Sequence, residues 1–257
     1  MTAYKFAMSK SLIGYGFLSI ACLIIIAWSV NSYYSVEAGA VSSVQPIIIH
    51  NQTQSLQVAK AELNGKLLHL AVKNGYSKNI DWFRISFGNR ESIEADFTFA
   101  EPSSLAPGES YEDAYSVESS PTATLNVTVV SVMFEDGTSD GDATYAKTIK
   151  EKRAGQKMQL KRLLPLLQKA IHAPNSNAAS VLQNLEAELA EIQEANDNTI
   201  SESKRVGLRN AKERILNEVQ RIKQMQVRDV SKDVRQDLIP INAHYEKILT
   251  KLEAYDF

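Results

Sequence analysis

An acidic segment at residues 136–142 carries the side chains of this sequence best suited to holding a metal ion. In a calcium-binding loop, oxygen ligands come from alternate positions, beginning with the first, and the sixth residue is a glycine. Gly141 occupies that sixth position here. The pattern therefore predicts a calcium turn whose ligands would be Asp136, Thr138, Asp140 and Asp142.

The same segment fits a second interpretation, in which it only connects a strand to a helix. The last ligand of a calcium loop should be a glutamate that binds through both carboxylate oxygens, but Lys147 stands at that position. Gly137 and Gly141 could adopt the unusual backbone angles of a tight turn, and Asp142 could cap the following helix. The connecting turn is the favoured interpretation, and the calcium site is the alternative.

The other residues that could carry chemistry form no recognisable catalytic motif in the sequence. The histidines are His50, His69, His172 and His244, and His69 lies in a strand pattern without a second histidine nearby. The sequence lacks the metalloprotease, nucleophile-elbow, phosphate-loop and dinucleotide-binding motifs. Carboxylates are plentiful, but no pair of them stands out for acid–base work. We therefore predict no catalytic residue, and no cofactor other than calcium at the acidic turn.

The single cysteine, Cys22, excludes an intrachain disulfide and a zinc site built from several cysteines. It lies in an uncharged apolar run, Ser11 to Val30, that is long enough to cross a bilayer as a helix. Lys5 and Lys10 precede this run and no lysine follows soon after it, which predicts a cytoplasmic N-terminus and an external main body. Cleavage as a signal peptide near Ala40 is the alternative to an uncleaved anchor.

From about residue 55 to 145, short alternating patterns separated by turn signals predict β-strands. Asn64 and Gly65 should join two strands in a hairpin. The segment Ile93 to Phe99 alternates as one half-buried strand, and Ile47 to His50 could add an edge strand. This arrangement favours an all-β, immunoglobulin-like antiparallel sandwich.

The segment from Leu125 to Phe134 is predicted to be the central strand with which the other strands pair. Its first half alternates and its second half is apolar on both faces, which is typical of a central strand buried on both sides. Strict alternation places Met133 on the same face as Leu125. In the segment Ile80 to Phe87, alternation turns Trp82 away from the phenylalanines, where it would be exposed or would meet the helices.

A short motif begins at the end of this strand. It consists of Phe-Glu-Asp-Gly-Thr at residues 134–138, then Gly141 and Asp142, then Arg153 and Gly155 in the following helix. In this motif the middle of the chain resembles exported bacterial proteins of uncharacterised function. The resemblance implies an extracytoplasmic β-sandwich and implies no reaction.

The remainder of the chain, from about residue 146 to 257, has the period of helices. Its apolar residues form narrow stripes near heptad spacing, which favours a helical hairpin or a self-associating coiled coil. Pro165 should kink or divide the first helix, and Pro240 should interrupt the last. The many basic residues alternate with acidic ones, as on a solvated face, and the net charge is −2, so we predict no nucleic-acid binding.

These patterns divide the chain into a transmembrane or signal segment at 1–35, a linker at 36–54, a sandwich at 55–145 and a helical region at 146–257. Our hypothesis is a membrane-tethered binding or scaffold protein without catalytic activity. It would be held in the bacterial inner membrane by residues 11–30, with a periplasmic or extracellular main body. Its C-terminal helices would contact a protein partner or a second copy. A hydrolase or metal-binding protein with a loop-built site is the alternative.

Overall fold

A computed structural model describes residues 46–255, except 89–90, 101, 118–123, 175–176, 193–198 and 229–232. The apolar run at residues 11–30 lies outside the described residues. Among the helices that are described, none has both the length and the apolar character needed to cross a bilayer. Residues 45–257 form one compact unit, so the expected sandwich and helical regions lie in the same unit.

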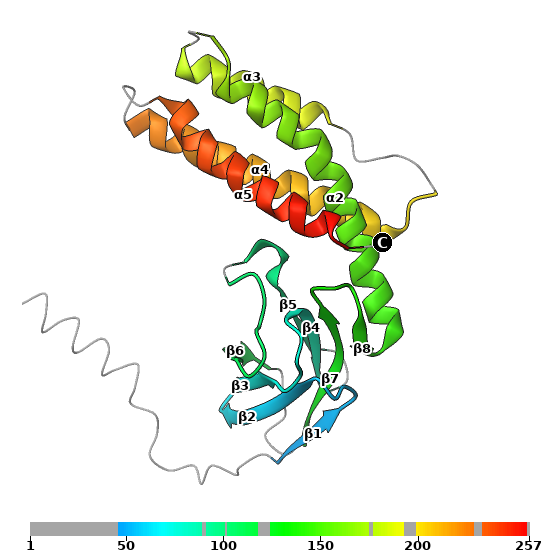
Figure 1. The fold of residues 1–257 in the computed structure, drawn as a ribbon. Coiled ribbons are helices and arrows are strands. Elements are labelled where there is room, and N and C mark those ends of the chain that lie inside the picture. The colour runs from blue at the N-terminus through cyan, green and yellow to red at the C-terminus, as the bar shows by residue number, and fades with distance from the viewer. Residues whose placement is uncertain are drawn as a thin grey trace, which may run out of the picture. The chain divides into compact units, whose positions relative to one another are not determined.

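Two β-sheets form the first part of this unit (Figure 1). The larger sheet has the strand order β1-β7-β4-β5, with β8 also paired to β7, and the smaller sheet has the order β2-β3-β6. The larger sheet contains β1 (Ile47–Asn51), β4 (Ile80–Phe87), β5 (Glu91–Asp96), β7 (Leu125–Phe134) and β8 (Ser139–Gly141). The smaller sheet contains β2 (Leu56–Asn64), β3 (Leu67–Asn74) and β6 (Ser110–Ser116).

The strand pairings are antiparallel, except that β1 runs parallel to β7. The predicted hairpin around Asn64 and Gly65 is confirmed, whereas an entirely antiparallel arrangement is wrong at the β1 edge. The two sheets share one apolar core, which includes Leu68 of β3, Phe83 of β4 and Val127 of β7. Burying one face of each sheet against the other is the usual way for two sheets to remove their apolar faces from water.

A β-bulge at Val130 reverses which side chains in the second half of β7 point into the core between the sheets. Residues on either side of it pair with consecutive residues of β4, so Val130 has no partner in the ladder. The bulge shifts the side-chain alternation by one residue. The residues of β7 in the core between the sheets are Leu125, Val127 and Val129 before the bulge, and Val132 and Phe134 after it. The predicted common face of Leu125 and Met133 is therefore wrong, because Met133 packs on the opposite side with Trp82.

The predicted strand from Ile93 to Phe99 is also wrong at its end. β5 stops at Asp96, and a 3-10 turn, η1 (Phe97–Phe99), follows it. The Asp96 carboxylate caps this turn by accepting a hydrogen bond from the backbone N–H of Thr98. Phe97 stays in the core between the sheets, while Phe99 packs against the helices.

The described part of the chain ends in four helices, α2 (Ala143–Ile171), α3 (Ala178–Glu191), α4 (Glu202–Arg228) and α5 (Val234–Glu253). The helical character of this region is confirmed. The apolar stripes of all four helices meet in a single core, and Leu163, Leu182, Ile215 and Leu252 are almost completely buried in it. The stripes predicted to form a hairpin or a coiled coil are thus covered within the same chain.

The prolines expected to break helices lie inside continuous ones. Pro165 is within α2 and Pro240 is within α5, so the predicted interruption at Pro240 is wrong. Both prolines are exposed, as are Lys161 and Gln236, whose carbonyl groups lose their intrahelical hydrogen bonds. Water can hydrate these carbonyl groups on the outer faces, and the packing of the opposite faces holds each helix together.

A pair of glycines lets α2 and α4 cross at close range. A Cβ atom on Gly155 would overlap the backbone carbonyl oxygen of Lys204, and one on Gly207 would overlap that of Lys152. Each glycine therefore removes a side chain where the backbone of the other helix passes. The crossing fixes the position of the α2 turn that contains residues 152–156.

Gly155→Ala should destabilise the protein by about 3 kcal/mol because of overpacking at this crossing. Helix propensity alone predicts that the variant gains about 1 kcal/mol of stability. The sign of the change in unfolding free energy therefore distinguishes overpacking from helix propensity. Urea unfolding followed by circular dichroism measures the change. Asn217→Ala, at an exposed site on α4, is the control and should stabilise by about 0.5 kcal/mol. A stabilised Gly155→Ala variant would contradict the close crossing.

Candidate functional site

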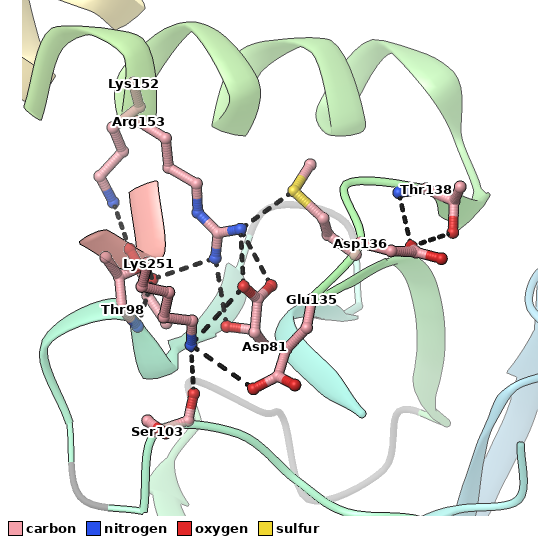
Figure 2. Close-up of polar contacts among 11 residues, drawn as sticks. Asp81, Thr98, Ser103, Glu135, Asp136, Thr138, Lys152, Arg153 and Lys251 are labelled. Atoms are coloured by element: carbon pink, nitrogen blue, oxygen red, sulfur yellow. Dashed lines mark hydrogen bonds and ion pairs between the residues drawn. The ribbon is translucent and has the colours of Figure 1, made fainter. Parts of the chain in front are cut away.

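A buried pair of opposite charges joins helix α2 to the larger sheet (Figure 2). Nη1 of Arg153 donates to the two carboxylate oxygens of Asp81 at 2.9 and 3.0 Å, and neither side chain is exposed to solvent. Nη2 of Arg153 donates to the backbone carbonyl oxygen of Asp81 at 3.2 Å. Several charge-assisted hydrogen bonds of this kind are needed to offset the lost hydration of a buried ion pair.

A second β-bulge places Asp81 opposite helix α2. Its neighbours Ile80 and Trp82 pair with consecutive residues of β7, so Asp81 is the extra residue on β4. Bulges re-aim side chains. Ile80 faces the core between the sheets, whereas Trp82 packs beside Ile149 of α2, and the Asp81 carboxylate reaches Arg153 on this same side.

A second carboxylate, Asp96 at the end of β5, contacts the same part of α2. Its Oδ2 lies 3.3 Å from Nζ of Lys152, and its Oδ1 lies 3.5 Å from Nη2 of Arg153. The Thr98 hydroxyl and backbone N–H also donate to Oδ1, at 2.6 and 3.1 Å. Burial alone would raise the pKa of Asp96, but Arg153, Lys152 and Thr98 outweigh it and hold the pKa below its ordinary value.

Helix α5 contributes a third cation, Lys251. Its Nζ donates to the backbone carbonyl oxygen of Ser103 and lies 3.8 Å from Oδ2 of Asp81 and 3.9 Å from Oε1 of Glu135. Burial lowers the pKa of Lys251, and the neighbouring carboxylates of Asp81 and Glu135 oppose that shift. We call the set the charge cluster and define it as Asp81, Asp96, Glu135, Lys152, Arg153 and Lys251. Figure 2 labels five of these residues, all except Asp96.

The charge cluster is better suited to joining elements than to reacting with a substrate. Burial raises the pKa of Asp81 to about 6, although Arg153 and Lys251 pull it down. A carboxyl group with such a pKa could exchange a proton near neutral pH. However, the Asp81 side chain is completely buried, and both of its oxygens already accept hydrogen bonds from Arg153, which stays protonated. The cluster instead links strands β4 and β5 and the turn after β7 to helices α2 and α5.

The predicted calcium ligands are each engaged by nearby protein groups. Asp136 accepts hydrogen bonds from Thr138 and forms an ion pair with Lys78 at 2.6 Å. Burial, the largest single influence, would raise the pKa of Asp136, but the contacts with Lys78 and Thr138 together outweigh it and lower the pKa to about 2. Asp140 accepts hydrogen bonds from the backbone N–H groups of Gln54 and Ser55 and from the Ser55 hydroxyl.

The acidic segment connects β7 to α2 through a turn and the short strand β8, which is compatible with the interpretation as a connection. Asp142 caps α2 by accepting a hydrogen bond from Thr144 N at 2.7 Å, and Gly137 and Gly141 have positive φ angles. Within the described residues, no group of three or more histidine, cysteine, aspartate or glutamate side chains could hold a metal ion. Calcium binding at Asp136, Thr138, Asp140 and Asp142 stays a prediction.

Two surface cavities lie apart from the charge cluster. One, of about 780 Å³, lies between α3 and α4 and is lined by Ala187, Lys223 and Val227 among others. The other, of about 520 Å³, lies between α4 and α5 and is lined by Phe99 and His244 among others. No residue of the charge cluster lines either cavity.

Comparisons with protein-family models, with curated proteins and with solved structures found no match to this chain. The function is therefore inferred from the contacts of the chain itself.

The sequence signalled the charge cluster only in part. Arg153 and Gly155 belong to the short motif after the central strand, and the structure gives each a packing role. Asp81 carried a signal that sequence reasoning missed, namely a charged residue between apolar neighbours in a strand. Asp96 and Lys251 carry no comparable signal, because many similar charges in this chain are exposed.

Arg153→Met should destabilise the protein by about 3–5 kcal/mol, because Asp81 and Asp96 would lose the main cation facing their carboxylates. Urea unfolding at pH 7 measures this loss. Arg153→Lys should not restore stability, since an ammonium group cannot bond the Asp81 carboxylate and carbonyl in the same geometry. Arg162→Met, at an exposed site of the same helix, is the matched control and should change stability by at most about 0.5 kcal/mol. A loss below about 1 kcal/mol for Arg153→Met would refute this role.

Asp81 should make the protein less stable as the pH rises from about 4 to about 6. Its pKa is raised from 3.8 to about 6 on folding, so in this interval the folded state holds a proton that the unfolded state has released. The full effect is about 3 kcal/mol, at about 1.4 kcal/mol per pKa unit. The depressed pKa values of Asp96 and Asp136 act below this interval.

Asp81→Asn removes this titration and supplies the test. Between pH 4 and pH 7, the difference in unfolding free energy between variant and parent should shift by about 2 kcal/mol in favour of the variant, since part of the full effect falls below pH 4. Denaturant titrations of both proteins at matched ionic strength measure the shift. Parallel pH profiles would show that Asp81 does not titrate in this interval.

Proposed function

We propose that this chain is a membrane-tethered binding or scaffold protein that acts outside the cytoplasm and catalyses no reaction. The observation that supports this proposal best is that the charge cluster bonds structural elements to one another. Its most deeply buried members, Asp81 and Arg153, are bonded to each other between the sheet and the helices, with no exposed surface. Groups held in this way maintain a fixed arrangement and are poorly placed to contact a substrate.

Three kinds of contact would hold the sheets and the helices as a single rigid body. The charge cluster bonds β4 and β5 to α2, and β4 to α5. Trp82 and Met133 pack against Ala146 and Ile149 of α2. Phe99 packs beside Tyr245 of α5, with their ring centroids 6.3 Å apart. A scaffold needs such rigidity, because it must present separate surfaces in a constant geometry.

We infer further that the two sheets form an immunoglobulin-like sandwich. The chain passes from one sheet to the other after β1, after β3, after β5 and after β6. Crossings of this kind are typical of Greek-key sandwiches. The inter-sheet disulfide of antibody domains has no counterpart, since the single cysteine lies in the apolar run.

The proposed ligand is a protein partner or a second copy of the chain. The helices would offer their outer faces, because their apolar stripes are already buried together. The groove between α3 and α4 is one such surface, and Val227 at its edge is 79% exposed. The proposed location is the bacterial inner membrane with a periplasmic main body, or the exterior after cleavage near Ala40.

The proposal is tested by cross-linking the full chain in bacterial cells and purifying it from the membrane fraction. Alkaline phosphatase fused after Phe257 should be active, because the main body would lie outside the cytoplasm. A covalent complex with one defined protein, or with a second copy, should be recovered. A chain without residues 11–30 is the control and should stay in the cytosol without that complex.

Two results would overturn this proposal. Phosphatase inactivity, together with fluorescence of a green fluorescent protein fused at the same position, would place the main body in the cytoplasm. Recovery of the chain alone, after efficient cross-linking of a known envelope complex in the same cells, would remove the binding role.

A further inference from the structure

The edge strand β1 exposes apolar residues at the end of the larger sheet. Ile48 and Ile49 are 46% and 45% exposed, and the strand sequence Ile-Ile-Ile-His-Asn contains no carboxylate or lysine. Isolated exposed isoleucines are common on protein surfaces. Two of them on an uncharged edge strand are less usual, because an open edge can pair with another strand.

The hydrogen bonds of β1 show which backbone groups face outward. The carbonyl oxygen of Pro46 accepts from Leu125 N, and the N–H of Gln52 donates to Val129 O. In a parallel pair, alternate residues of one strand bond to the other, so the even-numbered residues of this segment face β7. The N–H and C=O groups of Ile47, Ile49 and Asn51 consequently point away from β7, toward the open edge.

The other end strands of the two described sheets carry charges that oppose pairing with a copy. β6 contains Glu112 and Asp113, β5 contains Glu94, and β2 contains Lys60 and Glu62. Charged side chains on an edge are a common protection against unwanted strand pairing. Among these strands β1 lacks that protection, which distinguishes it as an edge that can accept a partner.

We propose that two copies of this chain associate by antiparallel pairing of their β1 strands, with the twofold axis at Ile49. This register places Ile49 opposite its own copy and Ile47 opposite Asn51, so each outward-facing N–H and C=O group gains a partner. Ile48 then lies opposite His50. No like charges meet, and the exposed isoleucines become cross-strand neighbours. The paired sheets would be continuous, in the order β5-β4-β7-β1-β1-β7-β4-β5.

A second copy is favoured over another occupant because the strand is self-complementary. An uncharged segment gains nothing electrostatically from a charged peptide, whereas two identical segments match their outward hydrogen-bonding groups and place Ile49 against Ile49. The helical region is a poorer route to self-association, because its apolar stripes are buried within the chain.

The pairing is also compatible with the proposed tether, although it does not depend on it. In this register the starting points of the two β1 strands lie roughly 13 Å apart along the strand direction, at about 3.3 Å per residue. Residues 31–46 could span up to roughly 50 Å. Both chains could therefore reach one membrane surface, and a shared membrane would raise the effective concentration of the pair.

Disulfide trapping of the full chain in detergent tests the pairing. Cys22→Ser removes the single native thiol, and Ile49→Cys then introduces one at the proposed axis. The two Cα atoms of a hydrogen-bonded antiparallel pair are about 5.5 Å apart, which is within the range that a disulfide spans. Mild oxidation should convert most of this variant into a covalent dimer. Glu112→Cys in the same background is the control on the β6 edge and should give little dimer.

Light scattering of uncrosslinked variants supplies the second measurement. The parent should be a dimer, and Ile49→Lys should be a monomer, because two lysines would meet at the axis. Leu67→Lys, at a site 40% exposed on the inner strand β3, is the matched control and should remain a dimer. Unchanged circular dichroism confirms that each variant folds.

Three results would overturn the proposal. Equal cross-linking of Ile49→Cys and Glu112→Cys would show only random collision. A dimer that survives Ile49→Lys would place the interface elsewhere. A monomeric parent without cross-linking would mean that something else covers β1, such as residues 31–45 of the same chain. A failed membrane experiment with successful trapping would reject the tether and leave the pairing intact.

Discussion

The burial of Arg153 is the constraint on which the junction between the sheets and the helices depends. A guanidinium group removed from water costs several kcal/mol unless carboxylate and carbonyl oxygens replace its hydration. Asp81 supplies most of these oxygens only because a bulge in β4 turns it toward α2. A regular strand would direct Asp81 into the apolar core between the sheets. The bulge and the buried arginine therefore require each other.

One turn of α2 contacts both the larger sheet and helix α4. The side chains of Lys152 and Arg153 bond to the sheet side, while the backbone of the same turn lies against α4 at Gly155 and Gly207. A shift of α2 along its axis would break the ion pairs and bring the glycine crossing into collision at the same time. Two contacts of different physical origin thus fix one helix position.

The sequence predicted the elements that follow from local periodicity and missed those that follow from distant partners. The hairpin at Asn64 and Gly65 and the cap at Asp142 depend on a few adjacent residues, so their patterns were sufficient. The bulges at Asp81 and Val130 depend on how β4 pairs with β7, which a single strand pattern does not contain. Phe99 does not continue the alternation of the strand, because it packs against helices that lie more than one hundred residues later in the sequence.

The two edge strands of the larger sheet, β5 and β1, differ in the charges that they carry. At the β5 end, Asp96 is used internally and its charge is matched by Lys152 and Arg153. At the β1 end, the strand itself carries no charged side chain, and its outward N–H and C=O groups bond to no other described segment. Because β1, β7 and β4 are adjacent, a strand added at β1 would join the same hydrogen-bonded sheet that holds Asp81. A copy bound at that edge would therefore be held in a fixed relation to the helices through the buried arginine.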